Sequence, residues 1–174
     1  MERIMIVSAT QKSHAMLTQF LTSCGVQAKT VAVSSGSEAR RALVDGDFDL
    51  VLVNTPLPDE FGHELAVFAA GSTGAGVVLL VKAEMADEVA ARVEDAGVFV
   101  VPKPLNRALL FGAVKLAQAA NRRIMGLQRQ NNILQQKIDD IRLVDRAKCA
   151  LIQYRLLTEP EAHRYIEREA MDSR

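Results

Sequence analysis

The sequence has little cysteine, no long apolar run and no set of residues typical of catalysis. Its two cysteines, Cys24 and Cys149, stand far apart and form no metal-binding or redox motif, so we expect the reducing cytoplasm as its location. No apolar run approaches the roughly 18 to 20 residues that a membrane-spanning helix needs. The chain begins with a short strand-like run rather than a signal peptide, and we therefore expect no membrane partner.

Catalytic and metal-binding patterns are also missing. The three histidines, His14, His63 and His163, are scattered along the chain. There is no Ser/His/Asp set, no pair of carboxylates on adjoining elements and no phosphate-binding loop. We therefore predict that the protein is not an enzyme and has no catalytic residue, no metal site and no cofactor.

What is present is a large apolar content and an uneven distribution of charge. An apolar fraction of 49% is enough for a packed core. The formal net charge is zero, but residues 1–105 carry 8 Lys/Arg against 13 Asp/Glu, residues 106–144 carry 7 against 2, and residues 145–174 carry 6 of each. The acidic first part and basic middle part indicate two functional parts, although a basic helix can equally be a solvated surface.

Short apolar runs alternate with segments of helical periodicity over the first 105 residues. The expected strands are residues 3–7, 26–33, 50–53, 76–81 and 98–101. The expected helices are residues 11–24, 37–43, 62–70, which ends at Gly71, and 85–96. Almost purely apolar strands separated by helices are typical of a parallel sheet covered on both faces. The fold class is therefore α/β, a flavodoxin-like doubly wound five-stranded parallel sheet.

A single long helix is expected from Asn106 to about Leu157, because this stretch contains no proline and only two glycines. At 1.5 Å per residue it would extend roughly 75 Å, and a helix of that length needs a partner. Apolar residues with one asparagine recur in alternating steps of three and four. These are Ile124, Leu127, Asn131, Leu134, Ile138 and Ile141, continued backwards by Leu110, Ala113, Ala117 and Ala120.

This spacing is a coiled-coil heptad, and it predicts a parallel homodimer. Isoleucine at a with leucine at d favours two strands, and Asn131 at an a position sets the register at some cost in stability. Lys137 would face Arg142 of the other chain, which is a repulsive pair. The alternative is that the stripe packs against its own chain.

After Ile141 the apolar stripe changes phase, and a further short helix follows. Thr158 is a good N-cap, Pro160 suits the first turn, and Glu161 completes a capping box. The residues expected to form apolar faces are Leu143, Ala147, Ala150, Leu151, Tyr154 and Leu157 on the long helix, and Ala162, Tyr165, Ile166 and Ala170 on the short one.

The segments "DLVLVN", "TPLPDEFG" and "VVPKPL" resemble the receiver domain of response regulators over residues 1 to about 120. That resemblance implies an aspartate phosphoacceptor after the third strand, two acidic residues that hold Mg²⁺ after the first, a Ser/Thr after the fourth and a lysine after the fifth. The matching positions here are Asn54 for the acceptor, Ser8 and Ala9 for the acids, Val81 for the hydroxyl and Lys103 for the lysine.

Only Lys103 is retained, so the resemblance implies a receiver without phosphoryl chemistry. An amide cannot form an acyl phosphate, and a site without carboxylates has little hold on Mg²⁺. We expect Lys103 to be structural and to donate hydrogen bonds near Asn54. Asp59 and Glu60 lie on the following loop and are expected to be solvated rather than metal ligands.

The segment "VDRAKCALIQYRLLTEPEAHRYIEREA" resembles the ANTAR family of transcription antitermination regulators over residues 140–174. The matching pairs are Ala147-Lys148 and Glu161-Ala162, whereas a third helix of the family pattern is not found here. The resemblance implies binding of hairpins in leader RNA by a dimer. The candidate RNA contacts are Arg142, Arg146, Lys148, Arg155, Arg164 and Arg168, with Tyr154, Tyr165 or His163 for base stacking.

Each candidate has a structural alternative. Tyr154 and Tyr165 lie on apolar faces and are expected in the core. Lys148 can pack its aliphatic stem inside the small helical unit, and Arg164 and Arg168 can decorate a solvated face.

Three parts are therefore predicted: a pseudo-receiver at 1–120, a coiled-coil linker at 121–142 and an incomplete ANTAR-like helical domain at 143–174. The predicted function is a dimeric antitermination regulator whose control does not need aspartate phosphorylation and comes from a sensor protein or a small-molecule effector. The alternative is a dimeric adaptor without RNA binding. DNA binding is disfavoured because the last helix starts with acidic residues.

Overall fold

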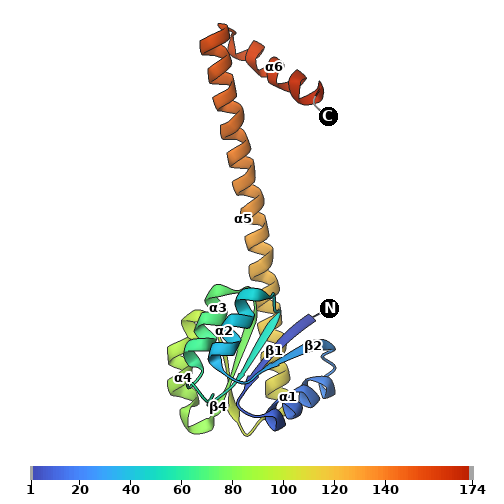
Figure 1. Cartoon of the computed structure of the whole chain (residues 1–174), viewed down its shortest axis with the longest axis vertical. Coiled ribbons are helices and arrows are strands. Elements are labelled where there is room, and N and C mark those ends of the chain that lie inside the picture. The colour runs from blue at the N-terminus through green and yellow to red at the C-terminus, as the bar shows by residue number, and fades with distance from the viewer. Residues whose placement is uncertain (1, 173–174) are drawn as a thin grey trace. The chain divides into compact units, whose positions relative to one another are not determined.

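The computed structural model describes residues 2–172, and it divides into two compact units, Met1–Met125 and Gly126–Arg174. The first unit is built on a parallel sheet in the order β2-β1-β3-β4-β5 (Figure 1). Its strands are β1 (Glu2–Ser8), β2 (Ala28–Val33), β3 (Leu50–Asn54), β4 (Gly76–Lys82) and β5 (Phe99–Lys103). The predicted α/β fold with five parallel strands is confirmed.

Helices cover both faces of this sheet. Successive residues of a strand point in opposite directions, so each strand contributes side chains to both helix layers. On one face Met5, Val51 and Leu79 pack against α2 (Gly36–Asp45), α3 (His63–Ser72) and α4 (Ala86–Val93), which is flanked by the short 3₁₀ helices η1 (Ala83–Met85) and η2 (Glu94–Ala96). On the other face Ile6 and Leu52 pack against α1 (Gln11–Ser23) and the beginning of α5 (Arg107–Arg155). Strands buried on both sides explain the almost continuous apolar runs.

The predicted end of α3 at Gly71 is wrong, because the helix continues to Ser72. Thr73 terminates it instead. Its backbone N–H and its hydroxyl both donate to the carbonyl of Ala69, at 3.1 and 2.7 Å, which satisfies a carbonyl that the helix end would leave free. Gly71 therefore lies inside the last turn.

The helix α5 has 49 residues, as the absence of proline predicted, and the side chain of Asn106 caps its start by accepting the N–H groups of Ala108 and Leu109 at 2.8 and 3.2 Å. The backward extension of the dimer seam is wrong. Leu110, Ala113 and Ala117 are buried against the sheet in the first unit, and only Ala120 of that set is exposed.

Gly76 explains how closely α5 approaches β4. A Cβ atom at Gly76 would lie 2.7 Å from the carbonyl oxygen of Ala117, so only glycine lets the helix backbone pack this tightly on the strand. Sequence periodicity assigned one face of the long helix to a partner chain, but over its first turns that face is used to complete the core.

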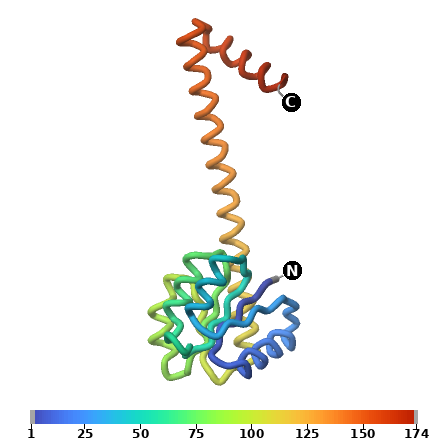
Figure 2. Tube along the Cα trace, in the orientation of Figure 1, coloured from blue at the N-terminus to red at the C-terminus, as the bar shows by residue number. Residues whose placement is uncertain are grey.

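In the second unit α5 ends at Arg155 and α6 (Glu159–Asp172) follows after a turn, which the trace in Figure 2 shows. Leu156 takes a left-handed conformation at φ 54° where the chain leaves α5. The predicted contact between Thr158 and Glu161 supplies one half of a capping box, since the Thr158 N–H donates to the Glu161 carboxylate at 2.8 Å and the Thr158 hydroxyl donates to it at 2.7 Å. Ala162 is fully buried between the two helices.

Candidate functional site

The carboxyl ends of the strands bring four polar residues to one edge of the sheet. Ser8 and Asn54 are register partners across β1 and β3, and Lys82 and Lys103 are partners across β4 and β5. Each is the last residue of its strand and comes two residues after a side chain that is buried under α1 and α5, so all four belong to that face of the sheet. Ligands of open α/β sheets bind at this edge.

The contacts within this group are specific. The Asn54 side-chain amide donates to the Ser8 hydroxyl at 2.9 Å, and Ser8 is only 1% exposed. The ammonium of Lys103 donates to the backbone carbonyl of Thr55, which directly follows Asn54. Three of the sequence-predicted residues, Ser8, Asn54 and Lys103, are therefore brought together, whereas Ala9 is exposed beyond the end of β1.

The assignment of Val81 to this site is wrong. Its side chain is completely buried in the opposite core with Val7 and Val53, because it is one residue out of phase with Leu80. The residue at this edge is Lys82, which the sequence reasoning missed. Counting two residues on from Leu80 along the strand would have found it.

The resulting electrostatics differ from those of a magnesium site. Burial lowers the pKa of Lys103, and the charge of Lys82 lowers it further. The four side chains at the strand ends offer two ammonium groups, an amide and a hydroxyl, with no carboxylate. Mg²⁺ needs carboxylate oxygens, so these residues do not fit that ion. Across residues 2–172 no group of three or more His, Cys, Asp or Glu side chains could hold a metal.

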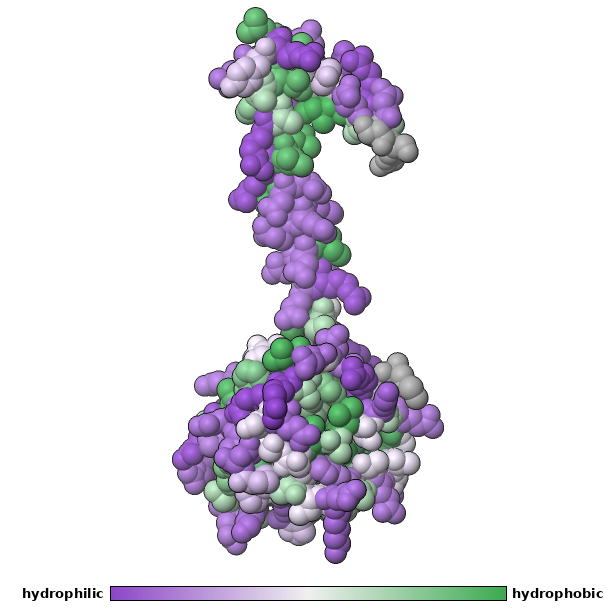
Figure 3. Space-filling view, in the orientation of Figure 1, coloured by the Kyte–Doolittle hydropathy of each residue, from purple (hydrophilic) through white to green (hydrophobic). Residues whose placement is uncertain are grey.

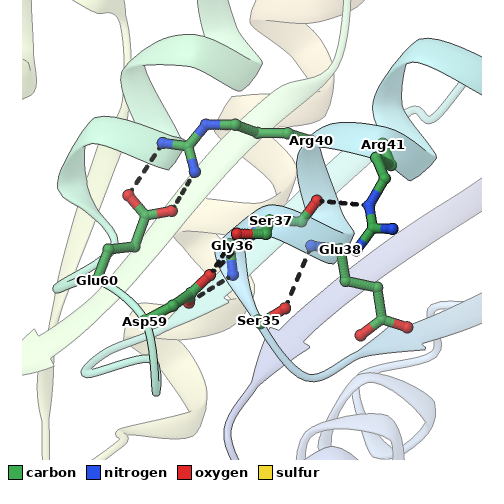
Figure 4. Close-up of polar contacts among 8 residues, drawn as sticks. All are labelled: Ser35, Gly36, Ser37, Glu38, Arg40, Arg41, Asp59 and Glu60. Carbon is green, nitrogen blue, oxygen red and sulfur yellow. Dashed lines mark hydrogen bonds and ion pairs between the residues drawn. The ribbon is translucent and has the colours of Figure 1, made fainter.

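Asp59 and Glu60 were expected to be solvated, but both side chains have specific partners on α2 (Figure 4). The Asp59 carboxylate is exposed, but it accepts the N–H groups of Gly36 and Ser37 and the Ser37 hydroxyl, each at 2.9 Å. These bonds at the start of α2 lower the pKa of Asp59 to about 2. Glu60 is half-buried and forms an ion pair with Arg40, whose Nη2 donates to Oε2 at 3.0 Å.

The two acids therefore fasten the loop after β3 to α2. The hydrogen bond from Arg40 to Glu60 raises the pKa of the guanidinium. A Cβ atom at Gly36 would lie 1.7 Å from the Glu60 carboxylate oxygen, so any larger residue there would displace this side chain from its present position. No motif indicates these partners, which lie 20 to 23 residues away along the chain.

The second unit gathers apolar side chains where the end of α5 meets α6, and Figure 3 shows them as a green region. Tyr165 lies at its border, half-buried, with the guanidinium carbons of Arg155 and Arg168 at 5.9 and 5.7 Å from the ring centroid. The residues that line the apolar groove are Ala147, Ala150, Leu151, Tyr165, Ile166, Glu169 and Ala170. Most of the predicted apolar faces therefore meet, but Leu143 is 61% exposed.

The other RNA candidates are distributed differently. Arg142 forms an ion pair with Asp139 at 3.7 Å, and Lys148 forms one with Glu159 at 2.8 Å. The Lys148 side chain is only 18% exposed, so its stem packs between the helices, and the hydrogen bond to Glu159 raises its pKa. The structure leaves the remaining candidates, Arg146 and Arg164, exposed.

The expectation that Tyr154 belongs to the core is wrong. Its side chain is 80% exposed, because the turn after Arg155 directs α6 toward the neighbouring face of α5. His163 has Glu167 as a neighbour at 3.3 Å one turn later in α6.

The heptad stripe is exposed. Its apolar members Ile124, Leu127, Leu134, Ile138 and Ile141 have side chains between 44% and 61% exposed. Asn131 is exposed too. The alternative in which the stripe packs against its own chain is therefore not what the described structure contains.

Comparison with solved structures gives the class of the first unit. The CheY-like response regulator receiver domain protein from Methanospirillum hungatei JF-1 is 22% identical with a TM-score of 0.61, covering 71% of this chain and 98% of that one. Adenylate cyclase from Rhodopirellula baltica has a TM-score of 0.65 at 16% identity, covering 75% and 97%. At such identities the likeness shows the fold alone, and the fold is that of a receiver domain.

Comparison of sequences gives the second part. Residues 133–174 match the ANTAR domain. The transcriptional regulatory protein PdtaR of Mycobacterium tuberculosis is 33% identical over 127 residues, which is 72% of this chain and 62% of that protein. The chain thus spans about three fifths of the length of the curated relatives it matches. It carries a receiver-like domain followed by an ANTAR domain and is homologous to PdtaR, so both predicted resemblances are confirmed. These families are regulatory rather than enzymatic.

None of the helices in residues 2–172 has an apolar stretch long enough to cross a membrane.

Proposed function

We propose that this protein is a dimeric transcription antitermination regulator that binds hairpins in leader RNA and acts in the cytoplasm. The observation that carries the proposal is the ANTAR match over residues 133–174, which overlaps the last three residues of the exposed heptad stripe, Leu134, Ile138 and Ile141. In this proposal residues 1–120 are a pseudo-receiver, 121–142 a coiled-coil linker and 143–174 the RNA-binding part.

Dimerisation is supported by the exposed seam. Five large apolar side chains form one exposed stripe on α5, and covering them with a second helix would remove this apolar surface from water. Asn131 lies between them at an a position, where it pairs best with the same residue of a parallel partner. Two linked RNA-binding parts suit two linked hairpins, because binding of the first raises the effective concentration of the second.

Independence from phosphorylation is supported by the edge of the sheet. The amide of Asn54 is no nucleophile, and Lys82 adds a second positive charge where receivers place a hydroxyl. The control signal in this proposal is a sensor protein or a small-molecule effector that acts through the receiver-like domain.

For RNA contact we propose the border of the apolar groove. The guanidinium groups of Arg155 and Arg168 lie near the ring of Tyr165, and an aromatic ring with guanidinium groups beside it suits an unpaired base and its phosphate. Arg146 and Arg164 are exposed and complete the basic surface, whereas Arg142 and Lys148 are paired with acids and contribute less.

That pairing is also the observation that favours the second candidate, a dimeric adaptor without RNA binding. The pairing of Arg142 and Lys148 with acids, and a charge balance of 6 against 6 over residues 145–174, give a weaker electrostatic attraction to RNA than a basic domain has.

Crosslinking in cells followed by sequencing of the bound RNA tests the proposal, with the protein at its natural genomic length. We expect leader transcripts that carry paired hairpins ahead of terminators. The double variant Arg155→Gln and Arg168→Gln should lose them, while Arg92→Gln, an exposed arginine paired with Glu88 in the first unit, should retain them. An expressed, dimeric protein that recovers no RNA above background would establish the adaptor instead.

A further inference from the structure

A cavity of about 440 Å³ opens beside the polar edge of the sheet. Its polar lining residues are Asn54, Lys103 and Ser13 of α1. Its apolar lining includes Met16 and Phe20 from α1 and Leu105 from the segment that joins β5 to α5. The cavity lies entirely within the first unit and is used by none of the contacts proposed for RNA or for the dimer.

The polar residues of the cavity lining have free donors that can receive negative charge. An ammonium group has three N–H donors, and the bond from Lys103 to the Thr55 carbonyl occupies one of them. The Asn54 amide likewise has two N–H donors, of which the bond to Ser8 uses one. Lys82 is the strand neighbour of Lys103 and adds a second positive charge at the same edge.

No carboxylate compensates these charges among the residues that line the cavity. The first turn of α1, which begins at this edge, has no acidic residue either. The nearest acidic residues after β3, Asp59 and Glu60, are held by Ser37 and by Arg40 instead. A lining that combines positive charge with apolar side chains selects a ligand that has both an anionic group and an apolar body.

We infer that this cavity binds a small molecule with an anionic group, a phosphate or a carboxylate, joined to an apolar body. The anionic group contacts Lys103 and Asn54, and the apolar body lies against Met16, Phe20 and Leu105. The inference deepens the proposed function, since it assigns the chemical class of the effector, and the ligand acts next to Asn106, where α5 begins.

The test uses the full chain and three probes: phenylphosphonate, inorganic phosphate and benzylamine. Phenylphosphonate has the anionic group and the ring but cannot transfer a phosphoryl group. Chemical shifts of backbone amides would be followed during titration with each probe. We expect phenylphosphonate to bind more tightly than phosphate, to shift residues of α1 and of the segment around Leu105, and benzylamine to produce no such shifts.

Three variants separate this site from general attraction. Lys103→Met removes one charge-assisted hydrogen bond and should weaken phenylphosphonate binding about tenfold or more. Met16→Glu places a negative charge at the exposed rim without altering the core and should weaken it similarly, so the test stands even where Lys103→Met fails to fold. Lys29→Met removes an exposed charge at the other end of the sheet and should bind like the unaltered chain.

Each of three results would overturn the inference: equal binding of benzylamine and phenylphosphonate, unchanged phenylphosphonate affinity in Met16→Glu, or no chemical-shift changes at ~10 mM phenylphosphonate. A probe concentration of ~10 mM saturates a site with a millimolar dissociation constant. RNA crosslinking reports separately on the proposed function. Loss of probe binding with RNA binding intact refutes only the effector site, whereas probe binding without RNA recovery refutes only the antiterminator.

Discussion

Leu134→Ala should weaken the proposed dimer without disturbing either unit of the isolated chain. Leu134 occupies a d position between Asn131 and Ile138, and its side chain is 59% exposed. It belongs to the second unit and to neither buried core cluster, so its truncation removes nothing from the core of the receiver-like domain. In a parallel dimer the same change occurs twice, once in each helix of the seam.

The expected magnitude follows from the exposed fraction. Complete burial of a leucine side chain contributes about 1.5 to 3 kcal/mol, so covering the exposed part of Leu134 contributes about 0.9 to 1.8 kcal/mol per chain. Two copies give about 1.8 to 3.5 kcal/mol, which corresponds to a roughly 20- to 300-fold higher dissociation constant. Alanine retains its Cβ, which makes the loss of buried area smaller than for complete removal of the side chain. The cavity left in the packed seam adds a further destabilisation of the dimer that offsets this difference.

Sedimentation equilibrium over a range of protein concentrations measures this dissociation constant. The control is Gln136→Ala, two residues further along at the outward f position, which should leave it unchanged. A chain that is monomeric before any substitution, or a Leu134→Ala variant that dimerises as tightly as the Gln136→Ala control, would refute the assignment of this stripe as the dimer seam.

Three further predictions concern the first unit. Gly76→Ala should lower the free energy of unfolding by about 1 to 3 kcal/mol, because its Cβ would meet the Ala117 carbonyl. Gly112→Ala, whose Cβ would meet nothing within 4 Å in the helix interior, should raise the free energy of unfolding by about 0.5 to 1 kcal/mol. Thermal unfolding measures both changes, and equal effects would contradict the close approach of α5 to β4. The pKa of Asp59 is lowered from 3.8 to about 2, so its contribution to stability is present above pH 3.8 and is lost as the pH falls toward 2; Asp59→Asn should remove that part of the acid dependence seen by circular dichroism, and an unchanged acid profile would refute the cap on α2. Asn54→Asp should remain unlabelled by acetyl phosphate with Mg²⁺, because Ser8 and its neighbour supply no carboxylates; an intact mass increased by one phosphoryl group would show that the site still binds the metal.

Most of the fold follows from local patterns in the sequence. Apolar runs such as Leu50 to Val53 alternate with helical segments, and each run became a strand within a few residues of its expected bounds. The break in periodicity at Thr158 and the Glu three residues later likewise predicted the start of α6. These features depend on spacing of residues close in the chain, which the sequence records directly.

The errors arise where a residue's partner is distant. Val81 and Lys82 differ only in which face of β4 they occupy, and a shift of one residue in the register reverses the assignment. Asp59 and Glu60 read as loop acids because Gly36 and Arg40, which hold them, belong to another element. Tyr154 became exposed because of the direction in which the chain turns after α5.

The sequence by itself thus determined the succession of strands and helices along the chain, the length of α5, the heptad stripe and the two resemblances. All of these are periodicities or short motifs. Only the tertiary structure decided where that stripe can begin. Leu110, Ala113 and Ala117 continue the repeat without a break, yet they are buried because the sheet lacks a cover on that face and α5 supplies it. A helix face has the same periodicity whether a sheet or a second helix covers it, so burial, and with it function, is settled by what packs against the face.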